Sequence, residues 1–427
     1  MSRHANHPTR AQVLAAIPPH CHELSFVRSM KSAMGSMCAT VLLMVVGYII
    51  LPPPTVTPLA ITAWSVYAML TGTVAFGMWV IGHECGHNAF CDPPWVGHIV
   101  GYVFHSILLV PYFTWRRSHA VHHAHTGHVH KGETHVPLVF GTVFGTLLHH
   151  VHRVIGNTAI GVIQLFMHLV IGWPAYLLIG TTGSSVRNHG MSNHFVAWGG
   201  AQLFPWRAWK LYLLSTGGVG TMLGLLYWWV QVRALAEVLG LYGGPLMVVN
   251  AWLTAVTWMQ HTDVNVPHLD ESLWTWMLGA LQTVDRPYHW ILDILHHRIG
   301  TTHMMHHLVS TIPHYHAQEA TVALRTAFPH LFQVDPTPIT EALWRLASQC
   351  VVSYDHGDGT HWFLPPPSPP PCARADVWRI AGKSYDLTTF AARHPGGANR
   401  IHDTKGPGAV VPQRVESAAA ADTGTDL

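Results

Sequence analysis

The stretch PLAITAWSVYAMLTGTVAFGMWVIGHECGH, residues 58–87, joins an apolar run to a pair of histidines. The apolar part, 58–81, carries no charged side chain and is long enough to cross a bilayer as a helix. The histidines that follow, His83 and His87, are four residues apart, and positions with this spacing lie on one face of a helix. The stretch therefore predicts a membrane-spanning helix that ends in two imidazoles pointing the same way.

Two further histidine clusters share one spacing, H-x-x-H-H. They are His119-Ala120-Val121-His122-His123 and His303-Met304-Met305-His306-His307. Together with the first cluster they supply eight imidazoles, more than a single tetrahedral zinc ion uses. Imidazole is also a good ligand for iron, so the three clusters indicate two metal ions held at a membrane surface.

The composition favours an integral membrane protein. The chain has 427 residues, of which 49% are hydrophobic and only 10% are charged, against about 25% charged in a typical soluble domain. The formal net charge of +2 does not suggest a nucleic-acid-binding surface. The six cysteines show neither a disulfide framework nor a paired C-x-x-C spacing, which favours a reducing, cytosol-facing environment. No cleavable secretory signal is evident, because the first apolar run begins only near Ala33.

Six apolar segments could meet the membrane: 33–51, 58–81, 96–113, 160–180, 211–230 and 242–260. Arg28 and Lys31 precede the first segment, whereas the connector 52–57 has no Lys or Arg. The positive-inside rule then places the N-terminus in the cytosol, and the first histidine cluster on the same side.

A parity argument sets the expected number of spans. If all three clusters hold one metal centre, segment 96–113 cannot cross and must be re-entrant or interfacial. Segment 160–180 contains Gln164, His168 and Pro174 and is expected to lie at the interface. The prediction is an all-α integral membrane protein with about four transmembrane helices and a cytosolic, histidine-rich metal-binding cap.

The organisation along the chain predicts three parts. Residues 1–364 form the membrane domain, and residues 365–371, Pro-Pro-Pro-Ser-Pro-Pro-Pro, form a stiff polyproline linker. Residues 372–427 form a small C-terminal segment whose end is rich in Gly, Ala, Ser and Thr.

The motifs also admit other interpretations. His83, Glu84 and His87 satisfy the H-E-x-x-H pattern of zinc proteases, in which the glutamate is a general base, but a protease leaves the other clusters unexplained. The cluster at 119–123 could be a basic surface turn, were its spacing not repeated at 303–307. Several histidines in polar or terminal segments are expected to be ordinary surface residues: His4, His7, His20, His22, His356 and His361.

The three clusters, with these spacings, resemble the histidine boxes of the membrane fatty acid desaturases, and most closely those of the microsomal acyl-lipid Δ12 (oleate) group. The similarity runs from about residue 9 to about residue 364. It includes the stretches 16–21, 83–90, 104–113, 172–174, 260–262 and 310–321. The residues Gly127-His128-Val129 after the second box are closer to the ω-3 group, so an ω-3 desaturase remains an alternative, as does a hydroxylase or conjugase.

The resemblance implies an oxygen-dependent diiron desaturase of the endoplasmic reticulum membrane, multi-pass, with its active site facing the cytosol. It would act on acyl chains of membrane phospholipids and use O2 and electrons from cytochrome b5 and its NADH-dependent reductase. The implied iron ligands are His83, His87, His119, His122, His123, His303, His306 and His307. A ninth histidine is expected outside the boxes, with His261 as the choice and His296 as the runner-up. His105 and His168 are expected to be packing or interface residues, and His314 and His316 at most to support the ligands.

The C-terminal segment resembles a cytochrome b5 domain, through residues 376–390 and His394-Pro395-Gly396-Gly397. In that family the histidine of H-P-G-G is an axial haem ligand, which implies a haem-binding role for His394. The second ligand lies some two dozen residues further on, and no histidine follows His402. We therefore expect a truncated segment that binds haem poorly, which argues against a third alternative, a membrane-anchored b5-type electron carrier.

Overall fold

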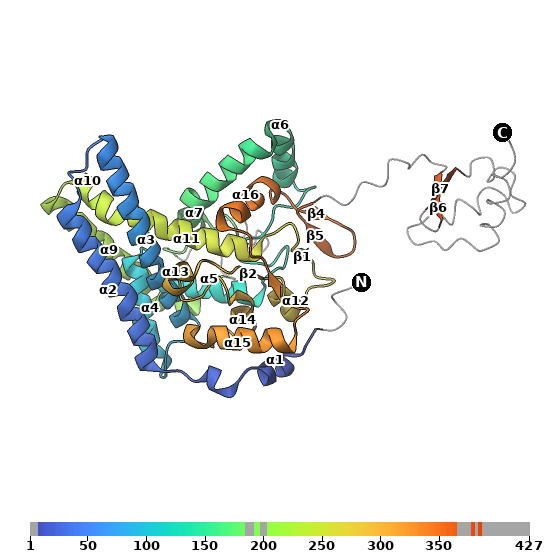
Figure 1. Cartoon of the computed structure of the whole chain (residues 1–427), viewed down its shortest axis with the longest axis horizontal. Helices are drawn as coiled ribbons and strands as arrows, with labels where there is room; N and C mark the ends of the chain where they lie inside the picture. The colour runs from blue at the N-terminus through green and yellow to red at the C-terminus, as the bar shows by residue number, and fades with distance from the viewer. Residues whose placement is uncertain (1–6, 184–191, 197–202, 365–376, 381–382, 387–427) are drawn as a thin grey trace, which may run out of the picture. The chain divides into compact units, whose positions relative to one another are not determined.

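The computed structural model describes residues 7–183, 192–196 and 203–364, and the backbone of 377–380 and 383–386. The chain divides into two compact units, Met1–Leu364 and Pro365–Leu427. The first unit is built mainly of helices (Figure 1), as the sequence predicted. The polyproline linker and His394 lie outside the described residues.

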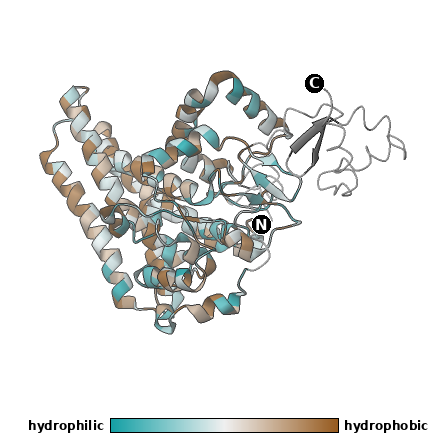
Figure 2. Cartoon of the chain, turned by 45° about the vertical axis from the view of Figure 1, so that its right-hand side comes forward, coloured by the Kyte–Doolittle hydropathy of each residue, from teal (hydrophilic) through white to brown (hydrophobic). Residues whose placement is uncertain are grey.

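Five helical runs among the described residues are long and apolar enough to cross a membrane. Their elements are α2 (Phe26–Ile50), α3 (Pro58–Gly86), α6 (Val143–Phe166) continued by a π-helix η2 (Met167–Gly172) and α7 (Trp173–Ile179), η3 (Trp206–Ala208) with α9 (Trp209–Val232), and α10 (Leu235–Val238), η4 (Leu239–Gly243) and α11 (Gly244–His261). Hydrophobic residues cover much of their length in Figure 2, and many are exposed, as a lipid-facing surface requires.

The run Val143–Ile179 makes one candidate span more than the four predicted. Of the three residues that favoured an interfacial position, His168 packs against α11 and Pro174 lies in α7. The His168 ring stacks on Trp258, with centroids 3.9 Å apart, and Nδ1 lies 2.9 Å from the Gln164 carbonyl oxygen. Pro174 stands in the first turn of α7, directly after the π-helix η2.

Helices α4 (Pro94–Ile107) and α5 (Tyr112–Ala124) form a pair bent by 105°. This is the geometry of a broken span or a re-entrant loop, and the sequence predicted a re-entrant or interfacial path for 96–113. The bend matters for the site, because it turns α5 and its histidines back toward the end of α3.

The core of the membrane unit lies where α3 packs against α2, α4 and α11. Two glycines of α3 allow this close approach. A Cβ on Gly72 would lie 2.5 Å from Val248 Cβ, and one on Gly82 would lie 2.3 Å from the His105 ring. His105 is fully buried there, and its Nε2 lies 3.2 Å from the Trp79 carbonyl oxygen.

Short elements form the remainder of the first unit. They are α1 (Arg10–Ala16), a 3-10 turn η1 (Pro19–His22), β1 (His268–Leu269), α12 (Trp276–Ala280), β2 (Val284–Asp285), α13 (Trp290–Leu295), α14 (His303–Leu308), α15 (His314–Ala327), β3 (Gln333–Val334), α16 (Ile339–Gln349), β4 (Tyr354–Asp355) and β5 (Thr360–Trp362). Strand β5 pairs antiparallel with β1 and β4, and β2 pairs parallel with β3. In the second unit, β6 (Val377–Ile380) and β7 (Lys383–Asp386) form an antiparallel pair.

A buried ion network joins the end of α11 to these short elements. Arg286 is almost fully buried; its Nε donates to the Met259 carbonyl oxygen at 2.7 Å and its Nη2 lies 3.0 Å from Asp263 Oδ2. Arg345 on α16 contacts the same carboxylate at 2.7 Å, and both arginines pair with Asp335. Because each buried charge has opposite partners, the network holds the cap against the last long helix.

Candidate metal centre

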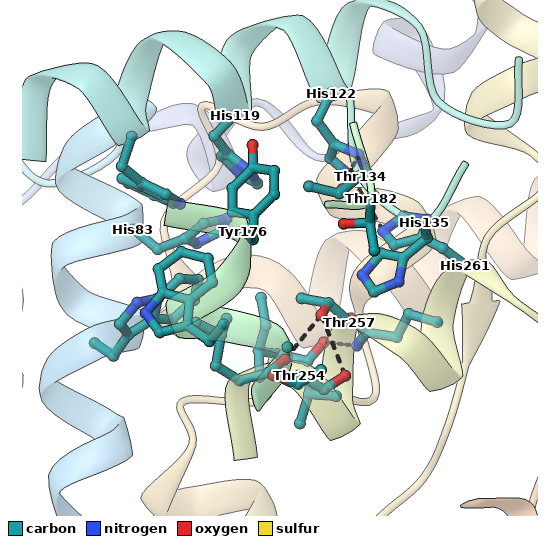
Figure 3. Close-up of a pocket in the computed structure, with 18 of the residues that line it drawn as sticks. His83, His119, His122, Thr134, His135, Tyr176, Thr182, Thr254, Thr257 and His261 are labelled. Atoms are coloured by element: carbon teal, nitrogen blue, oxygen red, sulfur yellow. Dashed lines mark hydrogen bonds between the residues drawn. The ribbon is translucent and has the colours of Figure 1, made fainter. Parts of the chain in front are cut away.

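Four helices bring the predicted histidines together. The first box lies at the end of α3, the second on α5 and the third on α14, and His261 is the last residue of α11. Figure 3 shows His83, His119, His122 and His261 around one pocket. All nine histidines that the resemblance implied are in this region of the fold.

Five of them form a first group. One ring nitrogen from each lies within 4.8 Å of the others, in the set His83, His87, His119, His123 and His306. His83 Nε2 and His87 Nε2 are 3.3 Å apart, and His119 Nε2 and His123 Nε2 are 3.1 Å apart.

A second group consists of His122, His261 and His307. His122 Nε2 lies 3.1 Å from His261 Nε2. His303 adjoins this group, because its Nε2 is 3.0 Å from the Nε2 atoms of both His261 and His307.

The chemistry of these groups fits bound transition metal ions. A neutral imidazole has one donor and one acceptor nitrogen, so a set of Nε2 atoms that face one another cannot all be paired among themselves. The Nε2 atom of His306, in the first group, is buried without a hydrogen-bond partner. Burial lowers the pKa of His306 to about 3, so that ring is neutral and offers a lone pair. Cations between these rings would use the converging lone pairs.

Two threonines orient histidines of the second group. Thr126 Oγ1 donates to the His122 carbonyl oxygen at 2.7 Å, and can therefore accept from His307 Nδ1, 3.1 Å away. Thr134 Oγ1 lies 2.8 Å from His122 Nδ1. A hydrogen bond at Nδ1 leaves Nε2 free to bind a metal. The sequence analysis missed both residues; the one local signal is that Thr126 follows His122 by one helical turn.

Other histidines lie outside the two groups. His296, the runner-up for the ninth ligand, packs between Phe76 and Trp252, and its Nε2 lies 3.2 Å from the Thr73 carbonyl oxygen. His314 contacts Glu84, whose Oε2 accepts from the His314 backbone N at 2.8 Å. Glu84, the general base of the protease alternative, is thus occupied by the start of α15.

A pocket opens beside the histidines (Figure 3). Its walls are largely aromatic and aliphatic, and include Phe76, Trp79, Trp115, Trp173, Leu253 and Ile299. His83, His119, His122, His261 and His303 form part of the lining. A concave apolar cavity that ends at metal-binding side chains suits a long hydrocarbon substrate.

His135 also lines this pocket, and the sequence analysis did not select it. Its ring stacks on His261, with centroids 5.9 Å apart, and its backbone φ is +55°. Such a φ is uncommon for a residue other than glycine and often marks a functional position.

Comparison with known proteins identifies the family. The model of the family described as fatty acid desaturase matches residues 62–334. The chain belongs to the fatty acid desaturase family.

Its relatives include plant enzymes of similar length. It is 38% identical over 361 residues to the Delta(12)-fatty-acid desaturase of Vernicia fordii, covering 83% of this chain and 91% of that protein. The identity to the Delta(12)-fatty-acid desaturase of Arabidopsis thaliana is 38%, with 82% and 89% covered. The oleoyl-12-hydroxylase of Ricinus communis is 36% identical, with 83% and 90% covered.

Membership of this family decides between the classes that the sequence left open. The protein is an oxidoreductase of lipid metabolism in a membrane, and not a zinc protease built around His83, Glu84 and His87. The family and the histidine groups together support iron binding.

Proposed function

We propose that the protein is a Δ12 acyl-lipid desaturase, which converts an oleoyl chain of a membrane lipid into a linoleoyl chain. The observation that carries the proposal is the apolar pocket whose wall includes histidines of all three boxes. The Δ12 position comes from the plant relatives, which are named Delta(12)-fatty-acid desaturases.

Two iron ions are proposed as the cofactor, held by the eight box histidines together with His261. They would supply the dioxygen activation that breaking an unactivated C–H bond requires. In the overall reaction two hydrogens leave the acyl chain, and O2 takes these together with two electrons and two protons to give two waters. We infer that the electrons come from cytochrome b5 and its NADH-dependent reductase.

The side chains of the protein align the substrate and exclude water. Trp79 packs against both Trp115 and Trp173, and the three side chains present apolar surface to a hydrocarbon along the pocket. Binding that holds one C–C bond of the acyl chain beside the metal centre makes the reaction effectively unimolecular, which lowers its entropic cost. Thr126 and Thr134 keep the rings of His307 and His122 in the orientation that ligation needs.

The endoplasmic reticulum is the proposed location, with the histidine boxes facing the cytosol. One of the plant relatives is described as an endoplasmic reticulum isozyme. Arg28 and Lys31, in the first two turns of α2, support a cytosolic N-terminus.

The test is expression of the chain in a yeast that lacks polyunsaturated lipids, followed by mass spectrometry of the fatty acids. We expect linoleate, and about two irons per chain in the purified protein. A 12-hydroxy acid would instead support the hydroxylase alternative suggested by the Ricinus relative, and product only after feeding linoleate would support an ω-3 desaturase.

A further inference from the structure

Four side chains with metal-ligand chemistry meet away from the histidine boxes. They are His20 and Cys21 of the η1 turn and His316 and Glu319 of α15. Each offers a ligand atom within 4.8 Å of the other three. Cys21 is fully buried at the base of the cluster, while the side chains of His20 and Glu319 are half exposed.

The distances are close to those of a tetrahedral zinc site. Bonds of about 2.3 Å to sulfur and about 2.0–2.2 Å to nitrogen or oxygen separate neighbouring ligand atoms by roughly 3.3–3.8 Å. Cys21 Sγ is 3.8 Å from His20 Nε2, at the upper end of this range. His20 Nε2 and Glu319 Oε1 are in direct contact at 2.9 Å and would move apart by about 0.4 Å to share one cation. His316 and Glu319 are three residues apart on α15 and so share a face.

The charges also suit a divalent cation. A thiolate and a carboxylate carry two negative charges, and two neutral imidazoles add none, so the four ligands balance one zinc ion. Burial, with a contribution from Glu319, raises the pKa of the Cys21 thiol, which keeps a proton on the sulfur in the absence of a cation. A coordinating metal removes that proton outright.

We propose that His20, Cys21, His316 and Glu319 form a structural zinc site, separate from the iron centre, which fastens the N-terminal segment to α15. Four protein ligands close the coordination shell, as in structural rather than catalytic zinc sites. The mixture of sulfur, nitrogen and oxygen ligands favours zinc over hard cations such as Mg²⁺ and Ca²⁺. This proposal does not depend on the Δ12 assignment.

Arg28 is the neighbour that a zinc ion would displace. Its Nη1 lies 3.1 Å from His316 Nε2, so it now donates to a lone pair that a metal could use. Arg28 is exposed, and it also stacks over the Tyr315 ring at 4.1 Å, a contact it can keep when it leaves His316. The displacement therefore costs little.

The location gives the site a structural role. Helix α15 follows the third box directly, and its first residue, His314, holds Glu84 of the first box. Beside it, Ser25 N donates to the Tyr315 hydroxyl oxygen at 2.7 Å. A zinc clip between η1 and α15 would keep the N-terminal segment, α15 and the first box in one arrangement.

The test measures zinc and iron in the purified full-length protein by mass spectrometry. We expect His20→Gln to lower the zinc content by about one ion per chain and to leave iron unchanged. The matched control is His22→Gln, because His22 is an exposed histidine of the same turn that lies outside the cluster. Equal zinc in the wild type and His20→Gln would overturn the proposal.

Cobalt substitution gives a second readout that does not depend on adventitious zinc. The histidine groups of the iron centre contain no cysteine, so a near-ultraviolet sulfur-to-cobalt band reports on Cys21. We expect the band in the wild type and in Cys38→Ser, whose cysteine is exposed, and not in Cys21→Ser. If Cys21→Ser does not fold, loss of band intensity in His20→Gln provides the same evidence. A folded wild type without the band would contradict the proposal.

Discussion

The second and third histidine boxes have the same spacing but rest on different supports. The second lies on α5, which has 13 residues and packs against the long helix α9 and the end of α3. The third lies on α14, which has six residues, too few to form a stable helix alone. Identical motifs therefore depend on different parts of the molecule to hold their imidazoles.

The support of α14 is a buried carboxylate and an apolar cluster. Asp285 Oδ1 accepts from Met304 N at 2.9 Å, and Asp285 Oδ2 lies 2.7 Å from Arg325 Nη2 on α15. Met304 and Met305 are fully buried among residues of α1, η1, α12 and α15. The lesson is that the third box depends on the extramembrane cap, whereas the first two depend on packing between long helices.

The largest expected effect is the same in both regions. His122→Ala and His306→Ala should each reduce the desaturated product to background, because each removes one proposed iron ligand and so weakens metal binding and changes its geometry. The measurement is product by mass spectrometry, with membrane fractionation to show that the protein is still present. His150→Ala, at an exposed position of α6, is the control and should keep its activity. Substantial activity in either ligand variant would remove that residue from the proposed ligand set.

The second-largest effect is expected at Asp285, which holds α14 and its histidine box in place. Asp285→Ala leaves the buried Met304 N–H without its acceptor, at a cost of about 1–3 kcal/mol in the free energy of unfolding. Asp285→Asn should cost less, because it keeps an oxygen that can accept from the Met304 N–H. Thermal unfolding and iron content of the purified variants measure both effects. Equal stability of the alanine variant and the wild type would show that α14 does not need this anchor.

A glycine substitution tests the packing of the long helices. Gly72→Ala places a Cβ 2.5 Å from Val248 Cβ and 2.6 Å from the Pro245 carbonyl oxygen, so α3 and α11 must separate, at about 1–3 kcal/mol. In Gly35→Ala of α2 the added Cβ meets nothing within 4 Å, and we expect no loss of stability. Thermal unfolding in detergent compares the two variants. Similar melting temperatures would mean that the α3–α11 contact is looser than these distances indicate.

The smallest effect is expected outside both regions. Deleting residues 372–427 should leave desaturation largely intact when separate cytochrome b5 is present, because residues 1–364 form a compact unit of their own that holds the histidine groups. Product yield from membranes supplemented with cytochrome b5 is the measurement. A bis-histidine haem spectrum in the full-length protein, or loss of activity on truncation despite added cytochrome b5, would show that the tail is a working electron donor.

Local patterns in the sequence were enough to predict much of the fold. Apolar runs predicted the long helices, because a helix in lipid must be apolar over the thickness of the bilayer. Helical spacing predicted that His303, His306 and His307 share a face, and α14 confirms it. The same reasoning placed segment 160–180 at the interface, whereas length and composition make Val143–Ile179 a fifth candidate span, in which His168 stacks on Trp258.

The sequence by itself determined the class of protein, the positions of the long helices along the chain and the three histidine boxes, because all of these depend on short-range periodicity and residue type. Only the tertiary structure decided which distant residues meet. It brought His261 rather than His296 to the histidine boxes. It also placed Thr126 beside Nδ1 of His307, Thr134 beside Nδ1 of His122, and the η1 turn beside α15. Contacts between residues far apart in the chain depend on how whole helices bend and pack, which residue spacing along a single helix does not encode.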